Sequence, residues 1–195
     1  MGKMIYLMGK SSTGKDTIYK QLLNWKECPL KTVVLYTTRP IRDHETDGEE
    51  YHFTDEAGYE KLCAEGKVIE ERTYQTFYGP WRYFTVDDGS IDLERENYLA
   101  IGTLESFLKT ADYYSRQNVL PVYIDVDDGV RLERAIARER QQEVPKYEEM
   151  CRRFLADAED FSEEKLKKAG ITRRFQNDEL ERCLGEIRDY IRDNL

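Results

Sequence analysis

The sequence predicts an α/β protein with a parallel sheet core, because short apolar segments alternate with segments of helical spacing. Residues 5–8 (IYLM) form an apolar run that is too short for a helix, so we expect a buried strand. Over residues 14–25 the spacing of Ile18 and Leu22 is helical, and a β-branched run, TVVLYT, follows at 32–37. Buried strands that alternate with helices are typical of a parallel sheet.

Residues 38–96 interrupt this alternation. Short strand candidates stand between turns, together with one candidate helix: strands at 51–53, 68–70 and 83–86, and a helix near 55–65. We expect this stretch to form an inserted small α+β lobe.

The alternation of strands and helices returns after the lobe. The expected elements are a strand at 98–101, a helix at 103–116, a strand at 119–126, helices at 129–140, 146–160 and 162–169, an edge strand near 171–175, and a helix at 177–193. We therefore expect residues 1–195 to form a single domain. Its core comprises 1–37, 97–128 and 170–195, and a helical segment over 129–169 stands beside the core.

Composition and charge narrow the classes of function. The net charge is −9 and charged residues make up 35% of the chain, which disfavours nucleic acid or an anionic membrane as a partner. No apolar run approaches the roughly 20 residues that a membrane span requires. Four cysteines stand far apart without a CxxC pair, and two histidines have no metal-ligand spacing, so we expect free thiols in a reducing cytoplasm rather than zinc. The oligomeric state stays open.

A glycine-rich segment follows the first expected strand and opens the first expected helix. Its residues are Gly9, Lys10, Ser11, Ser12, Thr13, Gly14, Lys15, Asp16 and Thr17. In this context glycines let successive backbone N–H groups face phosphate oxygens, and Lys15 adds a cation for the β- and γ-phosphates. Asp16 stands where a Ser or Thr usually ligates Mg²⁺, so either Asp16 or Thr17 is the candidate magnesium ligand. The alternative is a Gly/Ser turn that only caps a helix.

A second cluster of polar residues covers 37–53. Arg39 and Arg42 stand three apart after a strand end and can hold one phosphate with their forked donors. The hydroxyl groups of Tyr51 and Tyr78 could add further donors. The alternative is a solvated charged loop, because acidic residues surround both arginines.

A third cluster lies on the expected helix at 129–140. Arg131, Arg134 and Arg138 are spaced by three and four, so they share one helix face. The alternative is a salt-bridged surface helix, since glutamates interleave with the arginines. Just before this helix, Asp127 and Asp128 are better explained as its N-cap than as a metal site.

Together the motifs resemble the guanylate kinase family over almost the whole chain. They are the glycine-rich loop, TTRPIR at 37–42, YHF at 51–53, VIE at 68–70, FYG at 77–79 and QNDEL at 176–180. The resemblance implies a P-loop kinase with a parallel sheet core, a GMP-binding lobe over 38–96 and a mobile lid over 129–169. It implies transfer of a phosphoryl group from ATP, with Mg²⁺, to GMP, giving ADP and GDP in purine nucleotide metabolism.

The same resemblance assigns roles by matching positions. It assigns ATP binding to Gly9, Ser11, Ser12, Thr13, Gly14, Lys15, Asp16 and Thr17; GMP binding to Arg39, Arg42, Glu45, Tyr51, Glu70 and Tyr78; and catalysis to Lys15, Arg134, Arg138 and Arg153. Within the GMP set, Glu70 matches the acid that accepts from guanine N1–H and N2–H₂.

Two departures from the family pattern concern the acceptor. Pro80 replaces the usual small hydroxyl residue after Tyr-Gly, and in the segment 99–105 the acid that the family carries is missing or displaced, since Glu105 stands too far along to be equated with it. The loop ending Gly-Lys-Asp also resembles the ribose 1,5-bisphosphate phosphokinases. A kinase of another small phosphate acceptor is therefore one alternative, and a non-catalytic guanylate kinase-like binding module is another.

Overall fold

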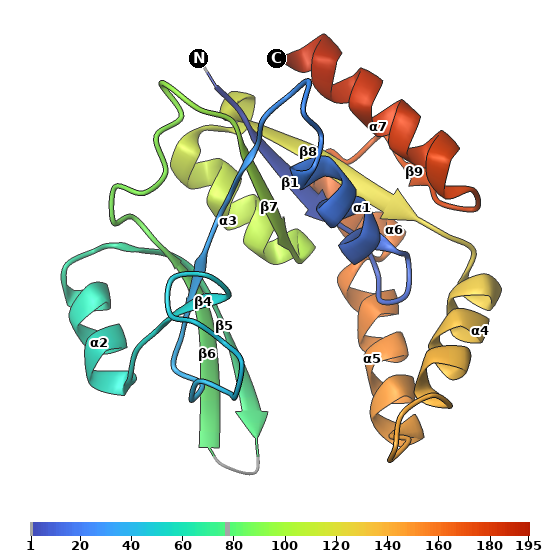
Figure 1. Cartoon of the computed structure of the whole chain (residues 1–195), viewed down its shortest axis with the longest axis horizontal. Helices are drawn as coiled ribbons and strands as arrows, with labels where there is room; N and C mark the ends of the chain where they lie inside the picture. Colours follow the sequence, from blue (N-terminus) through green and yellow to red (C-terminus); the bar gives the residue numbers. More distant parts are fainter. Residues whose placement is uncertain (1, 77–78) are drawn as a thin grey trace.

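The computed structural model describes residues 2–76 and 79–195, which form two β-sheets with helices around them (Figure 1). The larger sheet has the strand order β2-β7-β1-β8-β9, and all of its pairings are parallel. Its strands are β1 (Met4–Met8), β2 (Lys31–Thr32), β7 (Tyr98–Gly102), β8 (Val119–Asp125) and β9 (Phe175–Gln176). The predicted parallel sheet core is confirmed.

Helices cover both faces of the larger sheet, because successive strand residues point to opposite sides. They are α1 (Lys15–Leu23) and α7 (Leu180–Asn194) on one face, and α3 (Leu104–Tyr114), α6 (Glu163–Lys168) and the short 3₁₀ helix η1 (Arg116–Asn118) toward the other. Ile5 and Leu7 of β1 pack with α1 and α7, whereas Tyr6 between them packs on the side of α3. Burial on both faces explains why β1 is a continuous apolar run.

The smaller sheet has the strand order β4-β3-β6-β5 and mixes parallel and antiparallel pairs. Its strands are β3 (Leu35–Thr37), β4 (Tyr51–Phe53), β5 (Val68–Thr76) and β6 (Gly79–Val86), and α2 (Glu56–Ala64) accompanies them. β5 and β6 form a long antiparallel hairpin, so β5 extends well beyond the short strand predicted at 68–70.

The run at 32–37, predicted to be one strand, is divided between the two sheets. Val33 still donates its N–H to the carbonyl of Leu99 in β7 at 3.3 Å, whereas Tyr36 pairs with Phe84 of β6. β-branched residues favour an extended backbone but do not specify its partner strand. The predicted core segment 1–37 thus ends with a strand of the smaller sheet.

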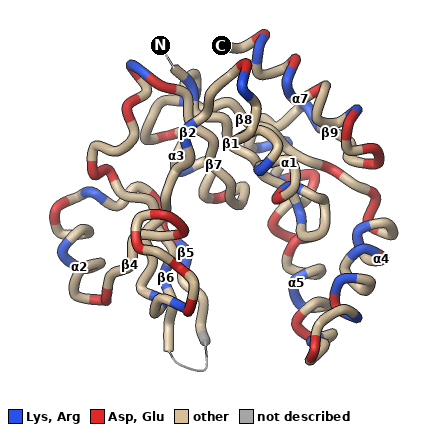
Figure 2. The backbone as a smooth tube through the Cα atoms, viewed as in Figure 1, with Lys and Arg blue, Asp and Glu red and all other residues tan. Residues whose placement is uncertain are grey.

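Two arms extend from the larger sheet, as Figure 1 shows: the smaller sheet, and a pair of helices, α4 (Asp128–Glu139) and α5 (Tyr147–Asp160). Basic and acidic residues are interspersed along both of these helices (Figure 2).

Near the C-terminus the edge strand is Phe175–Gln176 rather than 171–175, and the last helix begins at Leu180 rather than 177. Within the described ranges, no helix combines the length and the apolar character that crossing a membrane would need.

Candidate active site

The loop between β1 and α1 leaves the N-terminus of α1 accessible to an anion. Gly14, the N-cap residue, has a φ of 84°, and no side chain makes a capping hydrogen bond there. A Cβ at Gly14 would be strained and would lie 2.5 Å from the Asn177 Nδ2 atom. The first N–H groups of a helix have no partners within it and bind phosphate oxygens well. The loop therefore has the geometry that phosphate binding requires.

Asn177 holds this loop from the C-terminal part of the chain. Its Nδ2 atom donates to the Thr13 carbonyl at 2.7 Å, and its own N–H donates to the Asp125 carbonyl at the end of β8 at 2.9 Å. The buried Thr13 hydroxyl donates to the Lys10 carbonyl at 2.9 Å. The Thr13 side chain thus stabilises the conformation of the loop. Asn177, which the sequence analysis did not select as a site residue, attaches the loop to the end of β8.

Lys15 and two of the three predicted lid arginines line one cleft of about 480 Å³ at the N-terminus of α1. Its lining residues are Ser12, Gly14, Lys15, Asp16, Thr17, Arg134, Arg138, Asn177, Asp178 and Leu180. Arg134 also donates to the Asn177 carbonyl at 3.1 Å, which holds its guanidinium beside the loop. Arg153 of α5 approaches from the other side, with its guanidinium 3.4 Å from the Ser11 hydroxyl.

Burial and neighbouring cations lower the pKa of Lys15. Burial is the largest cause; the carboxylates of Asp16 and Asp157 oppose it, and the charges of Arg153 and Arg138 add to it. A cluster of cations that repel one another is stabilised when a polyanion such as a triphosphate binds between them. The electrostatics of the cleft therefore favour a phosphate ligand.

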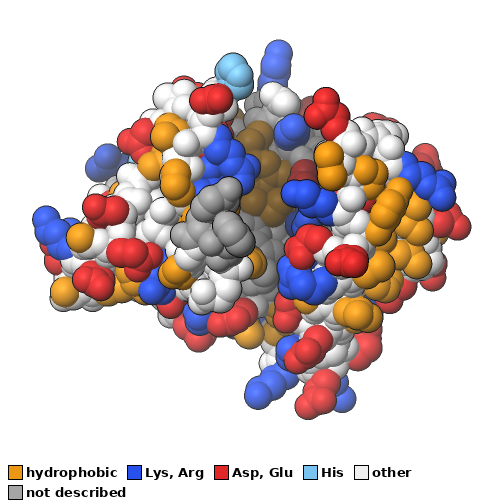
Figure 3. Space-filling view, turned by 90° about the horizontal axis from the view of Figure 1, so that it is seen from below, with side chains coloured by type: hydrophobic (Ala, Val, Ile, Leu, Met, Phe, Trp, Pro, Cys, Tyr) orange, Lys and Arg blue, Asp and Glu red, His pale blue; other side chains and the backbone are white. Residues whose placement is uncertain are grey.

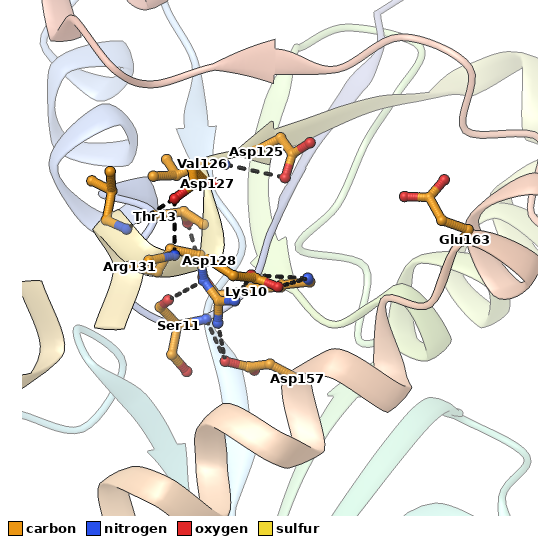
Figure 4. A network of polar contacts seen from close by, with 12 residues as sticks. Lys10, Ser11, Thr13, Asp125, Val126, Asp127, Asp128, Arg131, Asp157 and Glu163 are labelled. Carbon is orange, nitrogen blue, oxygen red and sulfur yellow. Dashed lines mark hydrogen bonds and ion pairs between the residues drawn. The ribbon is translucent and has the colours of Figure 1, made fainter. Parts of the chain in front are cut away.

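Arg131, which shares a helix face with Arg134 and Arg138, has a different environment. Its side chain is 1% exposed; the Nε atom donates to the Ser11 carbonyl at 2.9 Å and a terminal nitrogen lies 3.0 Å from the Asp157 carboxylate. Asp157 in turn accepts the Ser11 N–H at 2.7 Å, and Asp128 pairs with Arg131 as well. Figure 4 shows Ser11, Arg131 and Asp157 converging at the base of the helix pair. Helical spacing alone did not distinguish this buried arginine from Arg134, which is half-buried, and Arg138, which is exposed.

The N-cap of α4 is Asp127, whose carboxylate accepts from the N–H groups of Gly129 and Val130 at 2.9 and 3.2 Å. This confirms the interpretation of the acidic residues there as a helix cap. Across the described ranges 2–76 and 79–195, no three His, Cys, Asp or Glu side chains are placed to hold a metal ion together.

On the smaller sheet, Arg39 is buried and held by Glu45. Two Arg39 nitrogens lie 2.7 and 3.0 Å from the Glu45 carboxylate, and the guanidinium lies 5.5 Å from the ring centres of Tyr51 and Phe53. Glu45 also accepts the N–H of Arg42 at 2.8 Å, while the Arg42 side chain itself is exposed. The structure thus brings four of the six predicted acceptor residues together; another, Tyr78, lies outside the described residues.

Glu70, the remaining predicted acceptor residue, is buried on β5. Its Oε1 atom accepts the Thr85 hydroxyl at 2.8 Å. Its Oε2 atom lies 3.4 Å from the Nε atom of Arg72 but makes no hydrogen bond with it. A buried carboxylate oxygen without a hydrogen-bond donor is uncommon in native proteins.

Tyr6 of β1 points toward the same region, which the sequence analysis missed because it lies in an apolar strand. Its hydroxyl donates to the Ser106 hydroxyl at 2.8 Å, and burial, with the charge of Glu70 as a second cause, raises the pKa of Tyr6 to about 12. A Cβ at Gly102 would lie 2.4 Å from the Tyr6 hydroxyl and 2.5 Å from the Ser106 hydroxyl. The hydroxyl groups of Tyr6 and Ser106 therefore fill the space beside the backbone of Gly102. Gly102 belongs to the segment 99–105, in which the family's acid is not found at its usual place.

A cleft of about 720 Å³ separates β5 from α3 and α6. Its lining residues are Glu71, Arg72, Thr73, Tyr74, Thr103, Leu104, Glu105, Leu108, Asp160, Lys165, Lys168 and Ala169. Figure 3 shows a hollow between the two arms, with Lys and Arg side chains on both sides of it. This cleft lies between the smaller sheet and the helices α3 and α6, whereas the loop before α1 lines the separate cleft of about 480 Å³.

Comparison with known proteins identifies similar chains. A sequence model of the family described as guanylate kinase matches residues 1–84. The guanylate kinase of Symbiobacterium thermophilum is 30% identical over 200 residues, which cover 97% of this chain and 84% of that protein. The guanylate kinase of a Nostoc species is 38% identical over 79 residues, 40% of this chain, and the match spans only 39% of that relative's length.

Among solved structures, the crystal structure of guanylate kinase from Anaplasma phagocytophilum superposes with a TM-score of 0.64. The superposition covers 98% of this chain and 85% of that chain, at 19% sequence identity. The likeness concerns the fold, and it extends over both sheets and the helix pair.

Proposed function

Because the chain belongs to the guanylate kinase family, we propose that it transfers the γ-phosphoryl group of ATP to GMP, giving ADP and GDP. The observation that carries this proposal is the convergence of four cationic side chains on one loop. Lys15, Arg134 and Arg138 line the cleft at the N-terminus of α1, and Arg153 reaches Ser11 of the same loop. Such clusters neutralise the charge that a transferring phosphoryl group spreads over its oxygens.

The donor site in this proposal is the loop and the start of α1. ATP phosphates would be held by the backbone of the loop and by the following residues: Gly9, Ser11, Ser12, Thr13, Gly14, Lys15, Asp16 and Thr17. Asp16 and Thr17 both line the cleft beside Lys15 and carry oxygen atoms, the ligand type that Mg²⁺ prefers. One of them would hold the ion, which supplies further charge neutralisation on the β- and γ-phosphates when bound.

The acceptor site in this proposal lies on the smaller sheet. Arg39, Arg42 and Tyr51 would hold the GMP phosphate, and Glu45 positions Arg39 through its two-nitrogen ion pair. Glu70 would accept from guanine N1–H and N2–H₂. The acceptor phosphate is already an anionic nucleophile, so the reaction needs positioning and charge neutralisation rather than a general base.

An assay of ADP release across a panel of acceptors tests the proposal. We expect turnover with GMP and a weaker rate with AMP, because adenine would leave the Glu70 carboxylate without its donors at a cost of about 1–3 kcal/mol. Equal rates with GMP and AMP would contradict the assignment of guanine as the base that the site recognises. Faster turnover of ribose 1,5-bisphosphate than of GMP would identify that compound as the acceptor instead. Nucleotide binding without turnover of any acceptor would indicate a non-catalytic module.

The reducing, cytoplasmic setting belongs to the same proposal. Cys28, Cys63, Cys151 and Cys183 are all free thiols, as that compartment favours.

A further inference from the structure

We propose that Arg72 reads the acceptor base beside Glu70, with its guanidinium donating to the O6 carbonyl of guanine. This inference rests on the proposed function and names the group that distinguishes guanine at its 6-position. Arg72 carried no role in the sequence analysis, because a lone arginine on a strand has no motif around it.

The geometry of β5 places Glu70 and Arg72 together. They stand two residues apart on one strand, so their side chains share a face of the sheet. The Glu70 side chain is 1% exposed and that of Arg72 is 18% exposed. Arg72 lines the cleft of about 720 Å³ and at the same time contacts the buried Glu70 carboxylate.

Both groups retain unused hydrogen-bonding capacity. Glu70 Oε2 and Arg72 Nε are buried and form an ion pair at 3.4 Å, but neither makes a hydrogen bond to the other or to any described protein group. Buried polar atoms of native proteins nearly always have a hydrogen-bond partner, so an acceptor and a donor that both lack one at the same place point to a ligand with a donor and an acceptor. Guanine has such a pair in N1–H and O6.

The order of groups along the protein matches the edge of guanine. Glu70 offers Oε2, which accepts no hydrogen bond, and Oε1, which accepts the Thr85 hydroxyl and can accept a second donor; Arg72 offers a donor next to them. Guanine offers N2–H₂ and N1–H as donors and O6 as the adjacent acceptor, so all three positions are complementary. Adenine has an acceptor at N1 and a donor at N6, which places like against like at two of these positions. A pair of Glu70 and Arg72 therefore discriminates more sharply than Glu70 alone.

Arg72 is also close in the fold to Tyr51, one of the predicted GMP-binding residues. Arg72 stands opposite Tyr83 in the hairpin, and the centre of the Tyr83 ring lies 5.5 Å from that of the Tyr51 ring. The Arg39 guanidinium lies 5.5 Å from the centre of the Tyr51 ring. A short chain of neighbouring side chains thus connects Arg72 to the residues proposed to hold the GMP phosphate.

The test compares Arg72→Met with the wild type on three acceptors: GMP, IMP, which lacks the N2 amine, and 6-thio-GMP, whose sulfur is a weak acceptor at the O6 position. We expect kcat/KM for GMP to fall by about 10-fold to 100-fold, the range for loss of an arginine–guanine contact. The preference for GMP over 6-thio-GMP should disappear, the preference for GMP over IMP should persist, and the KM for ATP should not change.

Two further variants keep the test decisive. Arg82→Met is the matched control, because Arg82 lies in the same hairpin but pairs with Glu56 and Glu71 on the opposite face; both preferences should be retained. Arg72→Lys keeps the charge beside Glu70 but loses the planar fork, so it should fold and still lose part of the O6 preference. It replaces Arg72→Met in every comparison if the methionine variant does not fold.

Three results would overturn the inference. An unchanged ratio of GMP to 6-thio-GMP would leave Arg72 with only a structural ion pair, and faster GMP turnover in Arg72→Met would mean that Arg72 competes with the base for Glu70. Calorimetric titration of GMP into the wild-type protein separates this inference from the proposed function. GMP binding without turnover would refute only the kinase activity, and the preferences for GMP over 6-thio-GMP and over IMP would then be measured as ratios of affinities. Absence of GMP binding would refute both the kinase activity and the role of Arg72.

Discussion

Replacing Arg131 by methionine should destabilise the fold by about 3 kcal/mol. The Arg131 side chain is 1% exposed and lies 3.0 Å from Asp157, which is itself 17% exposed. Removing one partner of a buried ion pair costs about 3–5 kcal/mol, because the other charge is left without compensation. The lower end of that range applies, because the second partner, Asp128, is 54% exposed and regains water.

Arg152→Met is the control for this prediction. Arg152 also lies in the helix pair, and its guanidinium is 2.7 Å from Glu149, a separation shorter than that of the buried pair. Its side chain is 64% exposed and that of Glu149 is 51% exposed, so the loss should stay below about 1 kcal/mol. Burial rather than distance therefore decides the difference between the two variants.

Urea unfolding followed by circular dichroism measures both variants, and a thermal scan gives a second readout. For a chain of this length, about 3 kcal/mol corresponds to a fall in Tm of roughly 6–12 °C. Equal losses for the two variants, or a loss below about 1 kcal/mol for Arg131→Met, would refute the reasoning that the buried arginine joins the helix pair to the loop.

Three further predictions concern the site. Lys15→Ala should lower turnover by about 100-fold or more while circular dichroism stays unchanged, because this side chain faces the phosphate cleft rather than the core; near-normal turnover in the folded variant would contradict the role of Lys15. Glu70→Gln should reduce kcat/KM for GMP by about 10-fold to 100-fold and leave the KM for ATP unchanged, and equal effects on both substrates would count against a base-reading role. The hydrogen bond from Arg39 lowers the pKa of Glu45 from 4.5, so the stability that Glu45 contributes is complete above that pH and is lost as the pH falls through its lowered pKa. Unfolding free energies measured from about pH 5 to about pH 3 should therefore fall less steeply in Glu45→Gln than in the wild type, and parallel curves would disprove this.

The parts of the fold that depend on local sequence were predictable. The apolar run before Gly9 and the helical spacing after Gly14 fix the strand, the loop and the helix without help from distant residues. The cap at Asp127 was predictable for the same reason, since a capping carboxylate bonds to N–H groups only two and three residues ahead.

Features that depend on tertiary partners were not predictable. The run at 32–37 is uniformly rich in β-branched and apolar residues, but its first part pairs with the larger sheet and its last part with the smaller one. Nothing in the run itself indicates this division. Arg131 and Arg138 have the same residue type and the same helix face, yet one is buried against Asp157 and the other lines the cleft at the N-terminus of α1. A partner contributed by another helix or strand leaves no periodic signal in the sequence around either residue.

The hydrogen bond from the Ser11 N–H to Asp157 attaches α5 to the loop near the C-terminal end of the helix. At a rise of 1.5 Å per residue, Tyr147 lies about 15 Å from that point along the helix axis and Arg153 about 6 Å. A rotation of about 20° around Asp157 would therefore carry the far end of α5 about 5 Å but move Arg153 only about 2 Å. Any displacement of α5 around this anchor would thus be larger at the tip of the arm than at Arg153, whose guanidinium lies 3.4 Å from the Ser11 hydroxyl.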